Sequence, residues 1–330
     1  MRQSLPNSNN PLVTIGIPCF NAQDTIARAI NSALQQDWPR CEIVIVDDCS
    51  TDHSGTVIEH LMQSVQAEIC LIKHPQNQGP AVSRNTILKA AKGELICFFD
   101  DDDEGLPGRI TGQVKVLLAY EQQTGERLVA CYASGQRYYP NGYEKSLPAI
   151  GSRSEGVPHG SGLADYLLTY RKRSDWFYGS GTPTCALLAR ASTFAEIGGF
   201  DEKLRRVEDA DLAIRLALKG GHFIGTTDCL FNQYSTHAAD KSYEKNLVAE
   251  QQIAQKHRAY LETINRYYYA LHWPKLRYFH FKRQYAAFLW ELLQLWIRHP
   301  IAVPRHLWTT GPRRLRHEQR MTQKIQTSIS

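Results

Sequence analysis

Four consecutive aspartates and a glutamate follow an apolar segment, where residues 97–107 read CFFDDDDEGLP. Like charges this close repel one another, and a carboxylate taken out of water is costly unless a cation pairs with it. Mg²⁺ and Mn²⁺ suit such clusters, because they bind one or two carboxylates and leave positions open for substrate phosphates. Residues 100–103 therefore predict a divalent cation that arrives with a diphosphate.

Four short apolar segments predict the sheet that would position this cluster. Residues 12–18, 42–46, 68–72 and 94–99 show little polar alternation, which is typical of parallel strands buried on both faces. Helical patterns separate them, the third ending at Gly93 as a helix stop, so the sequence predicts an α/β fold with a doubly wound, mostly parallel sheet. Polar loops follow the segments at residues 18–21, 47–52, 74–80 and 100–103. Ligands of such sheets bind at the carboxyl ends of the strands, so these loops predict one shared site.

Each loop also has a purely structural interpretation. Asp48 or Asp52 could cap the helix that follows, residues 77–79 could form a turn, and the four aspartates could be a solvated loop. All four loops would nevertheless lie along one edge of one sheet, which favours a ligand site.

Charge divides the chain into two unlike parts. Its 330 residues are 42% hydrophobic and 22% charged, which is ordinary for one large soluble domain or two smaller ones. Residues 251–330 hold 14 Lys and Arg against three Glu and no Asp, a net charge of +11. Because the whole chain carries +5, residues 1–250 carry −6. The acidic body and the basic tail therefore need separate explanations.

Targeting and redox features predict a cytoplasmic protein. Residues 1–11 lack the apolar core of a signal peptide, and no segment approaches the roughly 20 apolar residues of a membrane-spanning helix. The longest candidate, residues 285–297, is interrupted by Glu291 and Gln294. The eight cysteines form no CxxC pair, so we expect buried thiols in a reducing compartment rather than disulfides or a zinc site.

The motifs together resemble those of family 2 glycosyltransferases of the GT-A fold. The matching pieces are VTIGIPCFN (13–21), ARAINSALQQDWP (27–39), EIVIVDDCSTD (42–52), NQGPAVSRN (77–85), AAKGELICFFDDDDEGLPGRI (90–110), IGGFDEKL (197–204) and VEDADLAIRLALKGG (207–221). They occur in the right order over residues 12–237, which is more specific than any single motif. Cys49 departs from the glycine that the family more often has in its DDGS turn.

The resemblance implies a set of donor-binding residues in the loops. Pro18, with its neighbours Phe20 and Asn21, would line the base pocket of a sugar nucleotide. Asp48 would accept a hydrogen bond from the N3–H group of uracil, and Arg84 would lie near the diphosphate.

The resemblance also implies a metal site on the acidic loop. Asp100 and Asp102 correspond to the family's DxD motif, with Asp102 as the direct ligand of Mn²⁺ or Mg²⁺. Asp101 fills the variable position on the donor side, and Asp103 is the family's following acidic residue. His237 either completes the metal shell or is structural.

A pair of acids further along the chain matches the family's catalytic base. Asp209, next to Glu208, would take the proton of the acceptor hydroxyl, and no covalent nucleophile is needed, so we expect a single displacement with inversion. The structural alternative is that both acids complement a helix dipole. Trp176, Gly181 and Thr182 lie where the family contacts the acceptor, and loop packing would explain them nearly as well.

The tail calls for a separate interpretation. We expect residues 1–11 to be a flexible N-terminus, 12–243 a catalytic domain divided into donor (12–105) and acceptor (106–243) halves, and 244–330 a helical tail. Residues 251–330 contain 13 of the 33 aromatic residues. Such a tail suits docking on anionic lipid, packing against the body or a second subunit in a homodimer, or RNA binding, in that order of preference.

These features predict a glycosyltransferase at the cytoplasmic face of a bacterial inner membrane, with no nucleic acid as partner. It would transfer a hexose or N-acetylhexosamine from a UDP-sugar to a lipid-linked saccharide during assembly of O-antigen, capsule or lipooligosaccharide. A DxD phosphohydrolase is the first alternative, although such enzymes want Thr or Val soon after the second aspartate, where Asp103-Glu104-Gly105 stands. A membrane or nucleic-acid adaptor without catalysis is the second, and it leaves the acidic loops unexplained.

Overall fold

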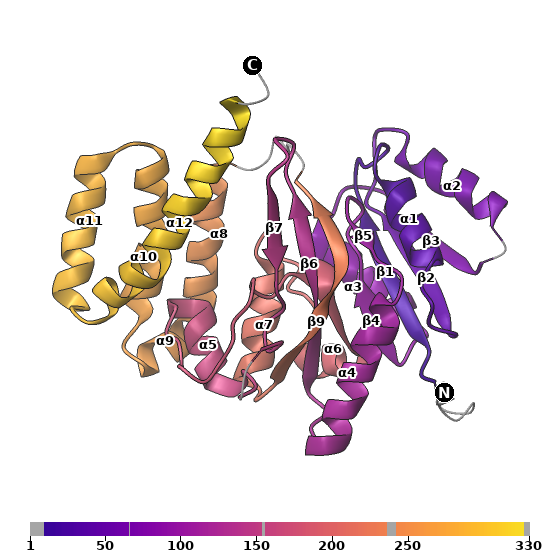
Figure 1. Cartoon of the computed structure of the whole chain (residues 1–330), viewed down its shortest axis with the longest axis horizontal. Coiled ribbons are helices and arrows are strands. Elements are labelled where there is room, and N and C mark those ends of the chain that lie inside the picture. The colour runs from indigo at the N-terminus through magenta and orange to yellow at the C-terminus, as the bar shows by residue number, and fades with distance from the viewer. Residues whose placement is uncertain (1–9, 66, 154–155, 236–241, 327–330) are drawn as a thin grey trace.

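The computed structural model describes residues 10–65, 67–153, 156–235 and 242–326, without some of the side chains after residue 312. In this part of the chain a nine-stranded sheet runs through the body of the molecule, and a group of helices forms one end (Figure 1). The strand order is β3-β2-β1-β4-β8-β6-β9-β5, with β7 paired to β6.

The donor half of the sheet is formed by four parallel strands. They are β1 (Val13–Cys19), β2 (Cys41–Asp47), β3 (Ile69–Lys73) and β4 (Leu95–Phe98). Each strand agrees with its predicted segment to within one residue at either end, so the prediction of a parallel α/β sheet is confirmed for this half. The register pairs Cys19 with Asp47 and Asp47 with Lys73, so the polar loops begin side by side.

Helices cover both faces of these strands. The connections are α1 (Ile26–Leu34), α2 (Ser54–Ser64) and α3 (Pro80–Ala90). Val44 and Val46 share one apolar core with Ile87 of α3, whereas Ile43 packs in a second core with Ile30 of α1. The doubly wound arrangement therefore follows from strands that bury both faces.

The end of α3 differs from the prediction. Ala91 is already extended, so the helix stops at Ala90 and the predicted stop at Gly93 is wrong. Gly93 instead donates its backbone N–H to Thr14 Oγ1 at 3.0 Å, and a Cβ added there would lie 2.5 Å from that oxygen. A glycine is needed here because the chain passes close to β1, not because a helix ends.

The second half of the sheet contains antiparallel pairs. Its strands are β5 (Glu104–Gly105), β6 (Val129–Tyr138), β7 (Glu144–Leu147), β8 (Leu187–Arg190) and β9 (His222–Tyr234). β8 pairs antiparallel to both β4 and β6, and so joins the two halves. Residues 138–143, YYPNGY, contain the Asn-Gly pair typical of a hairpin turn, and they connect β6 to β7.

Five further elements accompany these strands. They are α4 (Arg109–Thr124), α5 (Gly160–Thr169), the 3-10 helix η1 (Thr184–Ala186), α6 (Ala191–Ile197) and α7 (Glu208–Leu218). No helix was predicted at α4, whose buried side mixes Ile110, Val114 and Leu117 with Arg109 and Gln113. These buried polar residues obscure the apolar stripe from which a helix is recognised.

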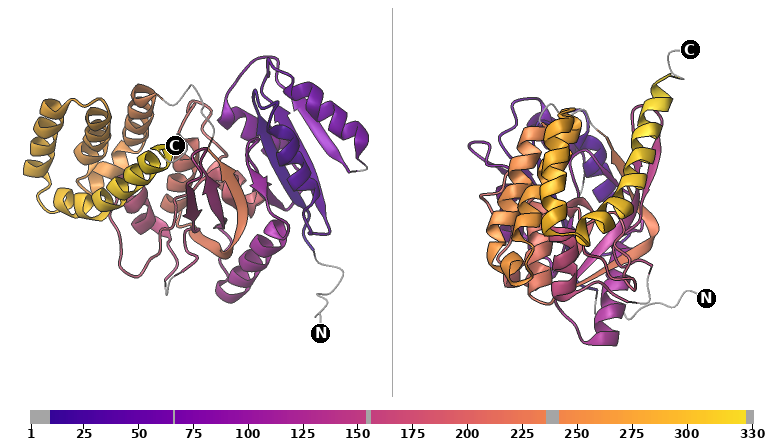
Figure 2. Two further views of the ribbon diagram at one scale, coloured as in Figure 1. Left: turned by 45° about the horizontal axis from the view of Figure 1, so that its top comes forward. Right: turned by 90° about the vertical axis from the view of Figure 1, so that its left-hand side faces the viewer.

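The C-terminal helices divide into two layers. They are α8 (Tyr243–Lys256), α9 (Arg258–Thr263), α10 (Tyr267–Phe281), α11 (Tyr285–Arg298) and α12 (Ala302–Gln326). Ile253 of α8 packs with Ile214 of α7, and Leu261 of α9 packs with Leu168, so the inner layer rests on the body. α11 forms the outer layer (Figure 2) and is joined to α10 through a small core that includes Tyr269 and Leu295. α12 returns to the body, where its His306 stacks on Tyr170 at the end of α5. None of the described helices has the length and apolar character needed to cross a membrane.

Candidate active site

The polar loops meet in one pocket at the carboxyl ends of the parallel strands. The pocket has a volume of about 410 Å³. Its lining comes from all four loops and from the segment before α7: Pro18, Cys19, Phe20, Asp48, Asn77, Gly79, Pro80, Ser83, Arg84, Asp100, Asp101, Asp102 and Arg205. The four loops thus lie together, as predicted. Six of the residues proposed to bind the donor line the pocket: Pro18, Phe20, Asp48, Arg84, Asp100 and Asp101.

Asp48 organises the back of this pocket. Its carboxylate is almost fully buried and is hydrogen-bonded to His74 Nδ1 at 2.7 Å. It also accepts from the backbone N–H groups of Gln78 at 2.9 Å and Gly79 at 2.7 Å. Asp52, rather than Asp48, accepts from the N–H of Ser54 at the start of α2, so the capping alternative for Asp48 is wrong. A carboxylate offers about four acceptor positions, which leaves Asp48 one for a ligand N–H.

The loop after β1 forms the rim of the pocket. Phe20 is 45% exposed, and its backbone N–H donates to Asp101 Oδ2 at 2.9 Å. Asn21 has a left-handed backbone (φ 51°), and its Oδ1 accepts from the N–H of Thr51 at 2.8 Å. Pro18 lines the pocket, whereas Asn21 holds the neighbouring loop in place. The rim is therefore fixed on both sides by hydrogen bonds to carboxylate and amide oxygens.

The acidic loop places its four aspartates in two directions. Asp100, Asp101 and Asp102 line the pocket, while Asp103 points inward and is only 4% exposed. Asp103 accepts from Gln233 Nε2 at 3.2 Å and from the N–H of Tyr234 at 3.3 Å.

Burial is the main cause of unusual pKa values in this loop. It raises the pKa of Asp101 to about 7, an effect that Asp102 and Asp100 increase and that the Phe20 N–H opposes. It raises the pKa of Asp103 to about 8, with further contributions from Asp100 and Asp102. The loop therefore holds more carboxylate than its surroundings can neutralise, which is the electrostatic setting of a cation site.

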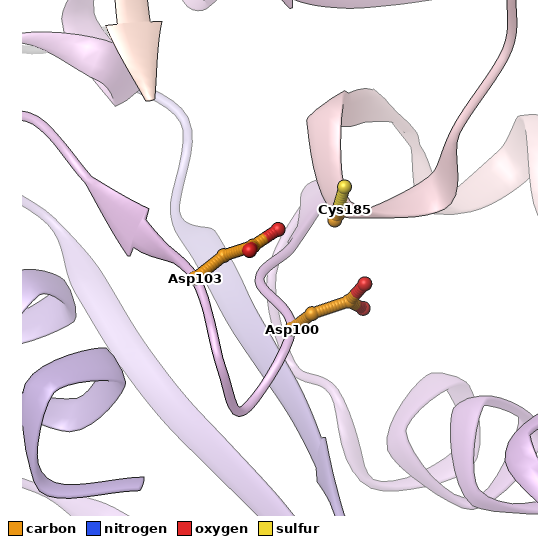
Figure 3. A group of neighbouring side chains, drawn as sticks. All are labelled: Asp100, Asp103 and Cys185. Carbon is orange, nitrogen blue, oxygen red and sulfur yellow. The ribbon is translucent and has the colours of Figure 1, made fainter. Parts of the chain in front are cut away.

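The donor atoms of the loop fit a hard divalent cation. Oxygen atoms of Asp100 and Asp103 and the sulfur of Cys185 lie within 4.8 Å of one another (Figure 3). Burial raises the pKa of Cys185 well above its usual value, so this thiol is neutral and a poor ligand. What remains is a set of carboxylate oxygens, which suits Mg²⁺ or Mn²⁺ rather than zinc. His237, the third proposed ligand, lies outside the described residues.

Arg84 connects this loop to helix α7. It is 7% exposed, and its guanidinium donates to Glu208 Oε1 at 2.5 Å and to Asp100 Oδ1 at 3.3 Å. Burial alone would lower the pKa of Arg84, but Asp100 and Glu208 outweigh it and raise the pKa above the usual value. The cation therefore stays charged beside the pocket and joins elements 124 residues apart in the chain.

Helix α7 begins with the two proposed catalytic acids. Glu208 is largely buried against Arg84, and Asp209 follows it in the first turn. Burial raises the pKa of Asp209 to about 6, with Glu208 adding to the rise, while the Ala210 N–H and Arg84 oppose it. A carboxyl with a pKa near 6 is basic enough to accept a proton at neutral pH and is still ionised there.

The three proposed acceptor residues do not line this pocket, and one residue that does line it was missed. Trp176 is 8% exposed and packs under the guanidinium of Arg173, 4.7 Å from the ring centroid, while Gly181 and Thr182 lie in the segment before η1. Arg205 lines the pocket and donates to Asn77 Oδ1 at 2.8 Å. Its sequence signal is a pair of arginines directly before the acidic start of α7.

Comparison with known proteins decides the family. The model of glycosyl transferase family 2 matches residues 14–178. The chain belongs to this family, and it is a glycosyltransferase of the GT-A fold. It is 32% identical over 217 residues to WcaA of Escherichia coli (strain K12), named for colanic acid biosynthesis, with 64% of this chain and 68% of WcaA covered.

Two further likenesses extend this result. The glycosyltransferase is 40% identical over 103 residues to WfaP of Escherichia coli, named as a UDP-Glc:α-D-GlcNAc-diphosphoundecaprenol β-1,3-glucosyltransferase, covering 31% of this chain and 40% of WfaP. Its fold resembles that of the mannosyltransferase PcManGT from Pyrobaculum calidifontis in complex with GDP-Man and Mn²⁺. That likeness has a TM-score of 0.54 at 16% identity and covers 93% of this chain and 81% of the other.

Proposed function

We propose that this glycosyltransferase is metal-dependent and inverting, and that it moves a hexose or N-acetylhexosamine from a UDP-sugar to a lipid-linked saccharide. The pathway would build a bacterial surface polysaccharide such as O-antigen, capsule or lipooligosaccharide. The observation that carries the proposal is the Arg84 bridge, which holds the acidic loop and the Glu208–Asp209 pair beside one pocket.

The residues of the pocket divide the chemistry between them. Asp209 takes the proton of the attacking hydroxyl, and burial, with a further contribution from Glu208, keeps the pKa of that carboxyl high enough for the task. Arg84 presents positive charge where the diphosphate of the donor would lie, next to Asp100. Mn²⁺ or Mg²⁺, held by Asp102 and Asp100, would supply charge neutralisation for the departing nucleoside diphosphate.

We assign the binding of the nucleotide base to Asp48 and to the loop after β1, which forms the rim of the pocket. One acceptor position of the Asp48 carboxylate remains for an N–H of the base, and the exposed Phe20 ring lies at the mouth. The name of WfaP supports a UDP-linked donor, whereas the GDP-Man in PcManGT makes a GDP-sugar the second donor to test.

We assign the acceptor to the class of sugars that are carried on a membrane lipid. The name of WfaP specifies a diphosphoundecaprenol-linked sugar. A lipid-linked acceptor places the enzyme on the cytoplasmic face of the inner membrane, either as a monomer or as a homodimer.

The proposal is tested by turnover of nucleotide sugars without acceptor. Purified protein should hydrolyse one UDP-sugar slowly in Mn²⁺ and stop when the metal is chelated. Asp102→Ala should weaken Mn²⁺-dependent donor binding in a calorimetric titration. Glu59→Gln, an exposed acid paired with Lys73 away from the pocket, is the matched control and should bind like the parent.

Two results would overturn the proposal. Release of phosphate from phosphomonoesters without turnover of any nucleotide sugar would favour the phosphohydrolase alternative. Unchanged donor binding by Asp102→Ala across a Mn²⁺ titration would remove this residue from the metal site.

A further inference from the structure

Helix α11 and the start of α12 expose a large apolar surface. We call it the α11–α12 surface, and it consists of Leu289, Trp290, Trp296, Ile297, Ile301 and Trp308, each between 51% and 83% exposed. Single exposed apolar residues are common, but three tryptophans and three aliphatic residues on consecutive helices are not. Figure 1 shows α11 at the end of the long axis opposite to α2, far from the donor strands.

The polarity of α11 is reversed relative to a helix that faces water. Its acid, Glu291, is buried and hydrogen-bonded to His272 Nδ1 at 2.5 Å. Gln294 Oε1 likewise accepts from the hydroxyl of Tyr268 at 3.0 Å, on the side that faces α10. The two polar residues that interrupt the apolar segment thus turn inward, and Trp296 and Ile297 turn outward. A surface helix in water shows the opposite arrangement, so this surface is built for an apolar environment.

The length of α11 excludes a spanning orientation. Its 14 residues extend about 21 Å, which is shorter than the roughly 30 Å hydrocarbon core of a bilayer. A helix of this size with outward tryptophans is suited to lie in the interface, where indole rings prefer the headgroup level.

Charge decides between a bilayer and a second copy of the chain. Arg298 and Arg305 are exposed on the same two helices, and the exposed Arg283 precedes α11, whereas Lys282 is paired with Glu244. Residues 251–330, which contain α11 and α12, carry a net charge of +11. A two-fold dimer through this surface would bring two such tails together, whereas an anionic membrane complements them.

We propose that the α11–α12 surface docks the enzyme on an anionic lipid bilayer, with the helices lying in the plane of the interface. The lipid-linked acceptor would then be collected by diffusion in two dimensions; only this consequence rests on the proposed function. Docking itself follows from the exposed indoles, the inward-facing Glu291 and Gln294, and the basic residues beside them.

Flotation with vesicles tests the docking surface. The full chain is mixed with vesicles of phosphatidylcholine alone or of phosphatidylcholine with phosphatidylglycerol. Parent protein should float with the anionic vesicles and be released by salt. The triple variant W296S/I297S/W308S should lose about tenfold or more in partitioning. Val248→Ser removes an apolar side chain that is 53% exposed on α8, outside the surface, and is the matched control.

The outcomes separate the docking surface from the catalytic proposal. Equal flotation of parent and triple variant would overturn the docking surface, as would absence of flotation together with a parent dimer that the triple variant abolishes. Hydrolysis of the UDP-sugar in solution should be the same for parent, triple variant and Val248→Ser. Flotation without any nucleotide-sugar turnover would overturn the catalytic proposal and leave the docking surface intact.

Discussion

The two sides of helix α7 carry aspartates two residues apart whose pKa values move in opposite directions. Burial raises the pKa of Asp209 to about 6 on the side of the pocket, and Glu208 adds to the rise. Burial would raise the pKa of Asp211 as well, but His257, Lys256 and Arg215 outweigh it and hold that pKa far below its usual range.

Burial acts on both carboxyls in the same direction, so burial alone does not decide whether an aspartate is suited to catalysis or to a structural role. Asp211 is fully buried, and its carboxylate is bonded to Arg215 Nε at 2.7 Å, Lys256 Nζ at 2.8 Å and His257 Nε2 at 3.0 Å. Lys256, at the end of α8, and His257, which follows it, fasten the tail helices to α7. Asp209 lacks such a set among the described residues and retains its affinity for a proton. One side of the helix is therefore structural and the other is suited to catalysis.

Replacement of the site-facing carboxylate should have the largest effect. Asp209→Asn keeps the shape of the side chain and removes the base, so we expect transfer to fall by about 10²–10⁴-fold. Donor binding and the unfolding midpoint should stay close to the parent values. Single-turnover transfer and calorimetric donor titration measure both, and transfer at the parent rate would contradict the assignment.

Replacement of the tail-facing carboxylate should act on stability instead. Asp211→Asn leaves Arg215 and His257 without their anion, and leaves Lys256 with Asp201 alone, which costs about 3–5 kcal/mol of unfolding free energy. Because the pKa of Asp211 is depressed in the fold, the difference from the parent should be complete above about pH 4 and shrink at lower pH.

A matched control isolates the effect of burial on that ion pair. Glu196→Gln breaks the exposed pair with Lys219 and should leave the urea midpoint unchanged. If both variants shifted the midpoint equally, the buried cluster around Asp211 would not be what holds the tail on the body.

Local sequence patterns predicted the first half of the fold, but not these long-range contacts. The apolar segments gave β1 to β4 to within one residue, because buried parallel strands leave a strong local pattern. Spacing placed Asp48 and residues 100–102 at one edge, and the pocket confirms it. No local pattern could show that Asp103 turns inward to Gln233, or that Lys256 and His257 reach Asp211.

The reversed polarity of α11 was hidden for the same reason. The composition of the tail predicted a basic aromatic helix, and Glu291 and Gln294 were interruptions of an apolar segment. Only the partners His272 and Tyr268 show that both residues face the protein. The direction of an amphipathic helix depends on tertiary packing, which its own sequence does not contain.

The pH dependence of transfer should follow the protonation of Asp209 and not that of Asp211. With a folded pKa of about 6, Asp209 is protonated and inactive below that pH and ionised above it. In saturating Mn²⁺, which would hold the carboxylates of the acidic loop ionised, we expect kcat/KM to fall about tenfold for each pH unit below this value and to be flat near neutrality. An acid limb near the ordinary aspartate pKa of about 4 would contradict the effect of burial on this carboxyl.

A conservative change at the bridge should have the smallest effect. Arg84→Lys retains the positive charge, but one ammonium group cannot match the fork that reaches Glu208 and Asp100. We expect kcat/KM to fall by about tenfold at neutral pH. Its decrease at low pH should occur in the same pH range as in the parent. Arg171→Lys, at an exposed pair with Asp165, is the control and should match the parent. A parent-like rate for Arg84→Lys would show that the bridge is dispensable.

The stereochemistry of transfer tests the central claim most directly. If Asp209 acts as a base on the acceptor hydroxyl, the sugar is displaced once and its anomeric configuration is inverted. Proton NMR of the isolated product, made from an α-linked UDP-sugar, should show a β-linkage from the anomeric coupling constant. An α-linkage would mean retention, and would contradict a single displacement with Asp209 as the base.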